Sequence, residues 1–138
     1  MPNLFKVEIL TPYGIYYSKE VELLEVRNAK SVVGVLAHHT PLISTVDLGM
    51  IRIKRNGRFR VFATSGGLIN IKKDGSVTLM LNTIEREDEI DINRAKLSLE
   101  RARKHLEEKD ADIKRAQAAI ERATNRLQIA KGLEDKDK

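Results

Sequence analysis

Apolar and polar residues alternate in short runs up to about residue 83, and the spacing then becomes helical. On a strand, successive side chains point to opposite faces, so alternation predicts strands with one buried face. The runs that alternate most clearly are residues 5–9, 21–23, 51–54, 59–62, 68–71 and 77–81. Met50 and Met80 lie in or beside such runs and are interpreted as core residues.

Turn signals separate these runs. Asn56-Gly57 and Asp74-Gly75 each lie between two apolar runs. Both central residues of a type I′ turn need positive φ, so each pair predicts a tight β-hairpin. Residues 11–14 and 65–67 give further turns. Eight to ten short strands joined in this way predict an antiparallel β-sandwich or a flattened barrel.

Beyond Asp91 apolar or small residues recur every three or four positions, as in the seam of a helix pair. The first series is Ile92, Ala95, Leu99, Ala102 and Leu106, and the second is Ile113, Ala116, Ile120, Ala123, Leu127 and Ala130. Asp110 or Asp112 can cap the second helix, and Gly132 is expected to end it. The fold class predicted is therefore α+β: a β-sandwich at 1–84, an acidic linker at 85–90, an antiparallel two-helix hairpin at 91–131 and a charged tail at 132–138.

The hairpin seam is thin. Every second seam residue is Ala, which lets two helices approach closely but removes little apolar area from water. Ordering about 40 residues costs conformational entropy. We therefore expect a marginal hairpin that needs support from the sandwich or from another surface.

Composition excludes several classes of protein. The chain has no Cys and three His, so it lacks disulfides and thiolate metal sites, and no cluster of metal ligands is evident. The net charge is +5, but acids and bases are interleaved in both halves, which argues against a nucleic-acid partner. Neither a Gly-rich phosphate loop nor a His–carboxylate cluster suggests an enzyme. With no signal peptide and no apolar run near 18 residues, we expect no membrane insertion.

The junction between the two halves has two interpretations. Asp91 can cap a helix, with Arg94 as its ion-pair partner. Alternatively, an antiparallel hairpin returns Arg122 and Arg126, which share one helix face, to the neighbourhood of Asp91 and Arg94. Guanidinium groups grip phosphate oxygens in pairs, so the second arrangement could bind a nucleotide.

Several motifs occur together in one order. The N-terminal half contains Val7-Glu8-Ile9-Leu10-Thr11-Pro12, Gly34-Val35-Leu36, His39-Thr40-Pro41-Leu42 and Ser65-Gly66-Gly67. The C-terminal half contains Ile90-Asp91-Ile92-Asn93-Arg94-Ala95 and Arg122-Ala123-Thr124-Asn125-Arg126-Leu127. In these motifs the chain resembles the epsilon subunit of bacterial F-type, proton-translocating ATP synthases. It departs from that family where Ala37-His38 replaces the usual Pro-Gly before His39.

The resemblance implies a ten-stranded β-sandwich, two C-terminal helices and a role without catalysis. Such a subunit belongs to the central stalk: its sandwich binds the gamma subunit and rests on the membrane c-ring, at the cytoplasmic face of the bacterial plasma membrane. Its hairpin is expected to fold against the sandwich or to extend beside gamma. The extended form inhibits ATP hydrolysis by placing basic residues against acidic segments of the catalytic beta subunits.

The resemblance also implies site residues. No cofactor is required, and ATP is expected to be a regulatory ligand that favours the folded hairpin. The nucleotide-binding residues implied are Glu85, Ile90, Asp91, Arg94, Ala95, Arg101, Arg122 and Arg126. The partner contacts implied are His39, Lys114, Arg115, Arg122 and Arg126. The alternative is the same stalk subunit without a functional nucleotide site.

Overall fold

The computed structural model describes residues 3–28 and 30–136, with side chains described as far as residue 131. The predicted fold class is confirmed: ten strands in two sheets precede two helices. The strands are β1 (Phe5–Thr11), β2 (Gly14–Val21), β3 (Leu23–Asn28), β4 (Val32–Val35), β5 (Leu42–Val46), β6 (Gly49–Arg55), β7 (Arg58–Thr64), β8 (Gly67–Ile71), β9 (Val77–Leu81) and β10 (Ile84–Arg86). The helices are α1 (Ile92–Leu106) and α2 (Ile113–Lys136).

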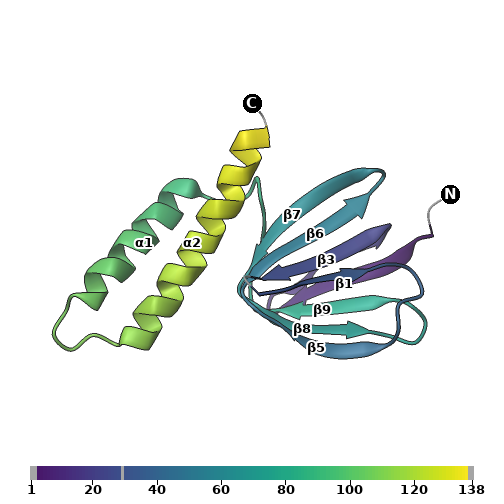
Figure 1. Cartoon of the computed structure of the whole chain (residues 1–138), viewed down its shortest axis with the longest axis horizontal. Coiled ribbons are helices and arrows are strands. Elements are labelled where there is room, and N and C mark those ends of the chain that lie inside the picture. Colours follow the sequence, from purple (N-terminus) through teal and green to yellow (C-terminus); the bar gives the residue numbers. More distant parts are fainter. Residues whose placement is uncertain (1–2, 29, 137–138) are drawn as a thin grey trace. The chain divides into compact units, whose positions relative to one another are not determined.

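The strands form two five-stranded layers (Figure 1). The first sheet has the order β2-β1-β9-β8-β5, and the second has the order β10-β7-β6-β3-β4. β1 and β9 pair in parallel, whereas β1–β2, β3–β4, β3–β6, β5–β8, β6–β7 and β8–β9 are antiparallel. Alternate side chains of both sheets fill the space between the layers; the largest that are fully buried are Ile9, Leu24, Ile51, Ile53, Ile71 and Leu79.

Residues 21–23 do not form one strand, contrary to the sequence prediction. β2 ends at Val21 in the first sheet and β3 begins at Leu23 in the second, so the chain changes layers at Glu22. The Glu22 N–H donates to the Lys54 carbonyl at 2.9 Å, which fixes this corner. Val21 and Leu24 are both fully buried, although they are three positions apart. The corner between them turns the chain, so the alternation of one strand does not continue into the next.

The two predicted β-hairpins form, but only one has the predicted turn. Asn56 and Gly57 both have positive φ (54° and 75°), as a type I′ turn requires. The β8–β9 connection is instead a five-residue loop, 72–76, in which Gly75 has a φ of 90°. Asp74 accepts hydrogen bonds from the Ser76 N–H and hydroxyl at 2.9 and 2.6 Å. This local side-chain turn replaces the two-residue turn.

The helical pair has the predicted start and a different end. Asp112 caps α2, since its Oδ1 accepts from the Arg115 N–H at 3.1 Å. Gly132 does not end α2, which continues to Lys136. A glycine inside a helix costs only about 1 kcal/mol relative to alanine, so a glycine alone does not stop a helix. By contacts the chain divides into two compact units after Glu85.

Candidate functional site

Asp91 is the N-cap of α1. Its φ and ψ are −81° and 100°, and its Oδ1 accepts a hydrogen bond from the Arg94 N–H at 3.0 Å. The Asp91 carbonyl also accepts from the Ala95 N–H at 3.0 Å. Asp91 therefore caps the helix, as the first of the two interpretations predicts. Within the described chain this hydrogen bond is made by Oδ1 and not by Oδ2. Because the side chain is exposed, Oδ2 stays accessible to a ligand.

The acidic segment before Asp91 is more ordered than a solvated linker. Glu85 and Arg86 belong to β10 and are half-buried. The Arg86 guanidinium pairs with Asp88 and, at 3.6 Å, with Glu89, while the Glu89 N–H donates to the Arg86 carbonyl. Glu87 is 8% exposed. Glu85 and Glu87 are therefore not solvated as the linker interpretation expects, whereas Asp88 and Glu89 are exposed.

Small residues occupy most of the buried positions of the two helices, although Ile129 of α2, at 8% exposed, is also buried. Ala95 and Ala102 of α1, and Ala116, Ala123 and Ala130 of α2, are all buried. The large residues predicted for the same seam are half-buried, and Ile113 is 58% exposed. Alanines at seven-residue spacing bring the backbones close together and push larger side chains to the flanks of the seam. The expected thin seam is thus realised in an even more alanine-rich form.

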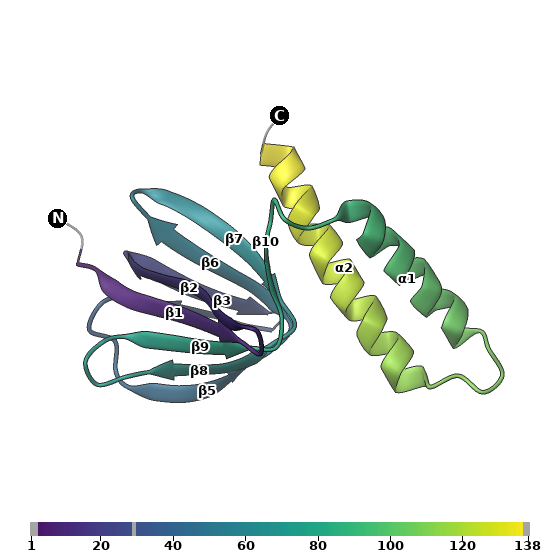
Figure 2. The ribbon, with the colours of Figure 1, turned by 180° about the vertical axis from the view of Figure 1, so that it is seen from behind.

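The antiparallel pairing places Arg122 and Arg126 beside the start of α1. Both views of the ribbon show the first turn of α1 next to the later turns of α2 (Figures 1 and 2). At a rise of about 1.5 Å per residue, residue 92 lies level with about residue 127. Arg94 and Arg122 are exposed and Arg126 is half-buried. By the same arithmetic Arg126 lies level with about residue 93 and Arg122 with about residue 97, so Asp91 and the three arginines span about 9 Å along the hairpin axis.

Other predicted nucleotide residues are placed differently. Arg101 is exposed on α1, about 15 Å along the helix from Asp91. Ile90 and Ala95 are buried (8% and 0% exposed), which is the placement of packing residues. Ile90, Asp91, Arg94 and Ala95 thus lie together at the start of α1, whereas Arg101 lies apart.

The predicted partner contacts lie on three segments. Lys114 and Arg115 are exposed in the first turn of α2, at the opposite end of the hairpin from Asp91. His39 precedes β5, and its Nδ1–H donates to the Thr40 carbonyl at 2.8 Å. Because a carbonyl only accepts, this bond assigns the proton to Nδ1 and leaves Nε2 for another contact.

A continuous apolar row crosses the outer face of the first sheet, and the sequence interpretation missed it. Leu68 pairs with Met80, Met80 with Leu10, and Leu10 with Ile15. Leu68, Met80 and Ile15 are 41%, 43% and 68% exposed. Met80 was wrongly interpreted as core, because alternation shows that a strand has two faces but not which face is covered. An exposed apolar row of this kind indicates a protein contact.

A second apolar surface follows the open edge of the sandwich. β4 and β5 are edge strands of their sheets. Residues 31–46, which contain both, have no Asp, Glu, Lys or Arg. The large exposed apolar side chains here are Val32, Val33, Leu36, Leu42 and Ile43. Edge strands usually carry charges that prevent unwanted pairing, so an uncharged edge indicates that another surface covers it.

Comparison with known proteins accounts for almost the whole chain. Residues 4–87 match the family described as "ATP synthase, Delta/Epsilon chain, beta-sandwich domain", and residues 88–131 match its "long alpha-helix domain". This chain belongs to the ATP synthase delta/epsilon family. Its members are subunits of ATP synthase.

Curated relatives of this delta/epsilon chain are bacterial. The "ATP synthase epsilon chain" of Desulforudis audaxviator is 39% identical over 105 residues, which is 76% of each chain. That of Caldicellulosiruptor bescii is 35% identical over 105 residues, also 76% of each chain. The family resemblance expected from the sequence is confirmed.

Solved structures support the same fold. A chain of the Euglena gracilis mitochondrial ATP synthase (OSCP/F1/c-ring) aligns with a TM-score of 0.69 at 20% identity, covering 100% of this chain and 84% of that one. A chain of the Tetrahymena thermophila mitochondrial ATP synthase (central stalk/c-ring) aligns with a TM-score of 0.57 at 12% identity, covering 96% and 97%.

The loop in which this delta/epsilon chain departs from the expected pattern has an unusual backbone. His38 stands where the pattern has Gly, and its φ is 67°. Only Gly adopts positive φ without a steric cost, so His38 has a backbone conformation that glycine would adopt more easily. The backbone at His38 is therefore locally strained.

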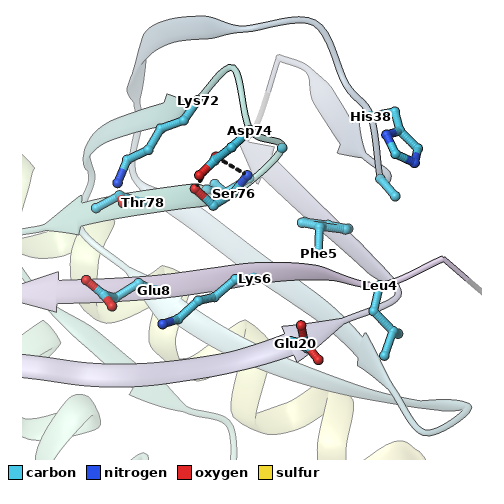
Figure 3. A pocket seen from close by; sticks show the side chains of 13 residues that line it. Leu4, Phe5, Lys6, Glu8, Glu20, His38, Lys72, Asp74, Ser76 and Thr78 are labelled. Atoms are coloured by element: carbon cyan, nitrogen blue, oxygen red, sulfur yellow. Dashed lines mark hydrogen bonds between the residues drawn. The ribbon is translucent and has the colours of Figure 1, made fainter.

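A cavity of about 480 Å³ lies beside this loop (Figure 3). Its lining combines two lysines, Lys6 and Lys72, with three carboxylates, Glu8, Glu20 and Asp74, and includes His38. The hydrogen bonds from Ser76 lower the pKa of Asp74. A lining of mixed charge matches neither an anion nor a cation, and none of the predicted nucleotide residues belongs to it.

Within residues 3–28 and 30–136 no group of three or more His, Cys, Asp or Glu could hold a metal ion. In that same part of the chain no helix is long and apolar enough to cross a membrane.

Proposed function

We propose that this chain is the non-catalytic epsilon subunit of the central stalk of an F-type ATP synthase. It couples the catalytic head to the c-ring and regulates ATP hydrolysis by folding and extending its helical hairpin. The observation that supports this most is the match of both halves to the delta/epsilon family, in order and over residues 4–131. We place the subunit at the cytoplasmic face of the bacterial plasma membrane as a peripheral component.

The sandwich supplies two surfaces for docking. The apolar row Leu68–Met80–Leu10–Ile15 is suited to a protein partner that buries it permanently, and we assign it to the gamma subunit. The uncharged edge around β4 and β5, with His39 in the loop between these strands, is assigned to the c-ring. Met80→Lys should weaken binding to gamma without unfolding the sandwich, since Met80 is 43% exposed; unchanged binding would contradict this assignment.

The hairpin supplies the switch. Alanine side chains bury little area, so the α1–α2 seam contributes little free energy and can open. In the extended form Lys114, Arg115, Arg122 and Arg126 would be available to acidic segments of the catalytic beta subunits. Amide exchange on the isolated chain should show faster exchange in α1 and α2 than in the β core. Equal protection of both units would count against an easily opened hairpin.

ATP favours the folded hairpin in this proposal. Arg122 and Arg126 come near Asp91 and Arg94 only when the two helices pair, so ATP would bind that form alone. At ten times its dissociation constant, ATP adds about 1.4 kcal/mol to the folded form. That suffices to shift two forms of nearly equal free energy.

Fluorescence transfer across the hairpin tests the nucleotide site. The chain has no cysteine, so the exposed positions Lys96 and Gln128 can be changed to Cys and labelled selectively. ATP should raise transfer efficiency in the parent and not in Arg94→Ala, Arg126→Ala. The exposed pair Arg103→Ala, Lys104→Ala removes the same charge and should respond like the parent.

An ATP response that survives Arg94→Ala, Arg126→Ala would remove these residues from the site. Absence of any ATP binding by calorimetry would leave the alternative, the same stalk subunit as a purely structural and inhibitory module. Neither outcome affects docking to gamma. The isolated chain should release no phosphate from ATP, and a measurable turnover would contradict the non-catalytic assignment.

A further inference from the structure

The β6–β7 hairpin concentrates positive charge at its tip. Residues 51–60 contain five Lys or Arg and no Asp or Glu: Arg52, Lys54, Arg55, Arg58 and Arg60. These ten residues carry a net charge of +5, which equals the net charge of the whole chain. The rest of the chain is therefore balanced, and the excess is local. The tip extends around the tight turn at Asn56 and Gly57, at an end of the sandwich (Figure 1).

Two of the five cations pair with carboxylates of β3 and of the corner that precedes it. Arg52 donates to Glu25 Oε2 at 2.6 Å, and Lys54 lies 4.0 Å from Glu22 Oε2. Glu22 also accepts from the Gly57 N–H at 3.1 Å. These two carboxylates are therefore already committed to the hairpin.

The other three cations face solvent. Arg55, Arg58 and Arg60 are exposed, and within the described chain no carboxylate lies within 4.0 Å of them. Arg55 and Arg58 stand opposite each other on either side of the turn. Lys19 of the other sheet lies 5.7 Å from the Tyr17 ring, and the Arg55 charge acts on the same tyrosine. Lys19 and Arg55, from different sheets, therefore both lie near Tyr17.

The geometry restricts two kinds of partner. An acidic peptide cannot add as a strand beside β6, which lies between β7 and β3, and on the other side of β7 the neighbouring strand β10 spans only three residues. A nucleic-acid base would need a free aromatic face. Phe59, which is 37% exposed, has the Arg52 guanidinium 4.1 Å from its ring centroid and Lys54 5.8 Å away, so that face is already taken.

We propose that the tip of the β6–β7 hairpin binds the anionic headgroups of a lipid bilayer surface. A protruding turn with unpaired guanidiniums needs no groove when its partner is a fluid layer of phosphates, which adapts to the shape of the tip. Guanidinium binds phosphate oxygens in pairs, and basic clusters near a membrane gain affinity with each added cation. This surface lies outside the nucleotide site and outside the two docking surfaces proposed above.

Sedimentation with vesicles tests the proposal on the full chain. The protein should bind phosphatidylcholine vesicles that contain phosphatidylglycerol, not vesicles of phosphatidylcholine alone, and salt should weaken the binding. Arg55→Gln, Arg58→Gln, Arg60→Gln should bind on the order of a hundredfold more weakly. The triple lysine variant at the same positions should keep most of the binding, because headgroup attraction depends mainly on charge.

A matched control separates the tip from net charge. Arg103→Gln, Lys104→Gln, Lys109→Gln removes three exposed cations from the hairpin unit and should bind like the parent. Equal loss in both glutamine variants would overturn the proposal, as would equal binding to both kinds of vesicle. Tighter binding of the tip to polyglutamate or to a single-stranded oligonucleotide than to the anionic vesicles would assign it to another partner and also overturn the proposal.

Discussion

The Arg94 N–H donates to the Asp91 carboxylate at 3.0 Å, which makes Asp91 the cap of α1 as well as a proposed ligand of ATP. The two roles need different properties of the same side chain. Capping needs an oxygen acceptor, which asparagine also supplies. Charge-dependent binding needs the carboxylate.

Substitution at Asp91 should separate these roles. Asp91→Ala should destabilise the hairpin by about 1 kcal/mol, because the cap is lost, whereas Asp91→Asn should leave its stability nearly unchanged. Helix content followed by circular dichroism during thermal unfolding measures both. If Asp91→Asn destabilises as much as Asp91→Ala, the contribution comes from the charge at the helix terminus rather than from the hydrogen bond.

Two glycines on strands of the second sheet should respond oppositely to alanine. A Cβ at Gly49 would lie 2.0 Å from the Arg27 carbonyl oxygen, on the paired strand β3, whereas a Cβ at Gly34 meets nothing within 4 Å. Gly49→Ala should therefore destabilise the sandwich by several kcal/mol or prevent folding. Gly34→Ala should be neutral or stabilise by a few tenths of a kcal/mol, because it restricts the unfolded chain. Urea denaturation of the two variants compares them directly.

Replacing His38 by glycine should increase the stability of the protein. A φ of 67° destabilises a non-glycine residue by about 1 kcal/mol. Glycine removes this strain, but it also has more conformational freedom in the unfolded chain, which offsets part of the gain. His38→Gly should raise stability by about 0.5 kcal/mol, and His38→Ala should not. A decrease with glycine would indicate that the imidazole itself stabilises the loop.

Acid should weaken the 72–76 loop through Asp74. Its pKa is lowered chiefly by the hydrogen bonds from the Ser76 hydroxyl and N–H. A carboxyl group with a depressed folded-state pKa stabilises the fold above its unfolded pKa, and that contribution is lost as pH falls through the folded pKa. Ser76→Ala should bring the Asp74 pKa, measured by NMR titration, closer to its ordinary value. Ser18→Ala, at an exposed strand position, is the control and should leave it unchanged.

Much of the fold follows from local rules that the sequence obeys. Alternation predicts where side chains change face, Asn56-Gly57 predicts its turn, and Asp112 predicts a helix start, because each depends on residues within a few positions. Asp74-Gly75 and Gly132 show the limit of such rules. Ser76 donates two hydrogen bonds to Asp74, and these favour a five-residue loop over the predicted two-residue turn. Gly132 lies inside α2, because the helix continues beyond it to Lys136.

The alternating pattern, the alanine seam and the motifs that indicate the delta/epsilon family are properties of the sequence itself, because periodicity and spacing are written along the chain. Which face of a strand is covered is decided only when sheets assemble. Met80 became part of an exposed row because β9 lies between β1 and β8, and β4 and β5 became uncovered edges because of the strand order. At the cationic tip the β6–β7 pairing sets Arg55 opposite Arg58, and the pairing of β3 with β6 brings Glu22 and Glu25 beside Lys54 and Arg52. Such surfaces depend on contacts between distant segments, and the free energy of those contacts appears only in the folded chain.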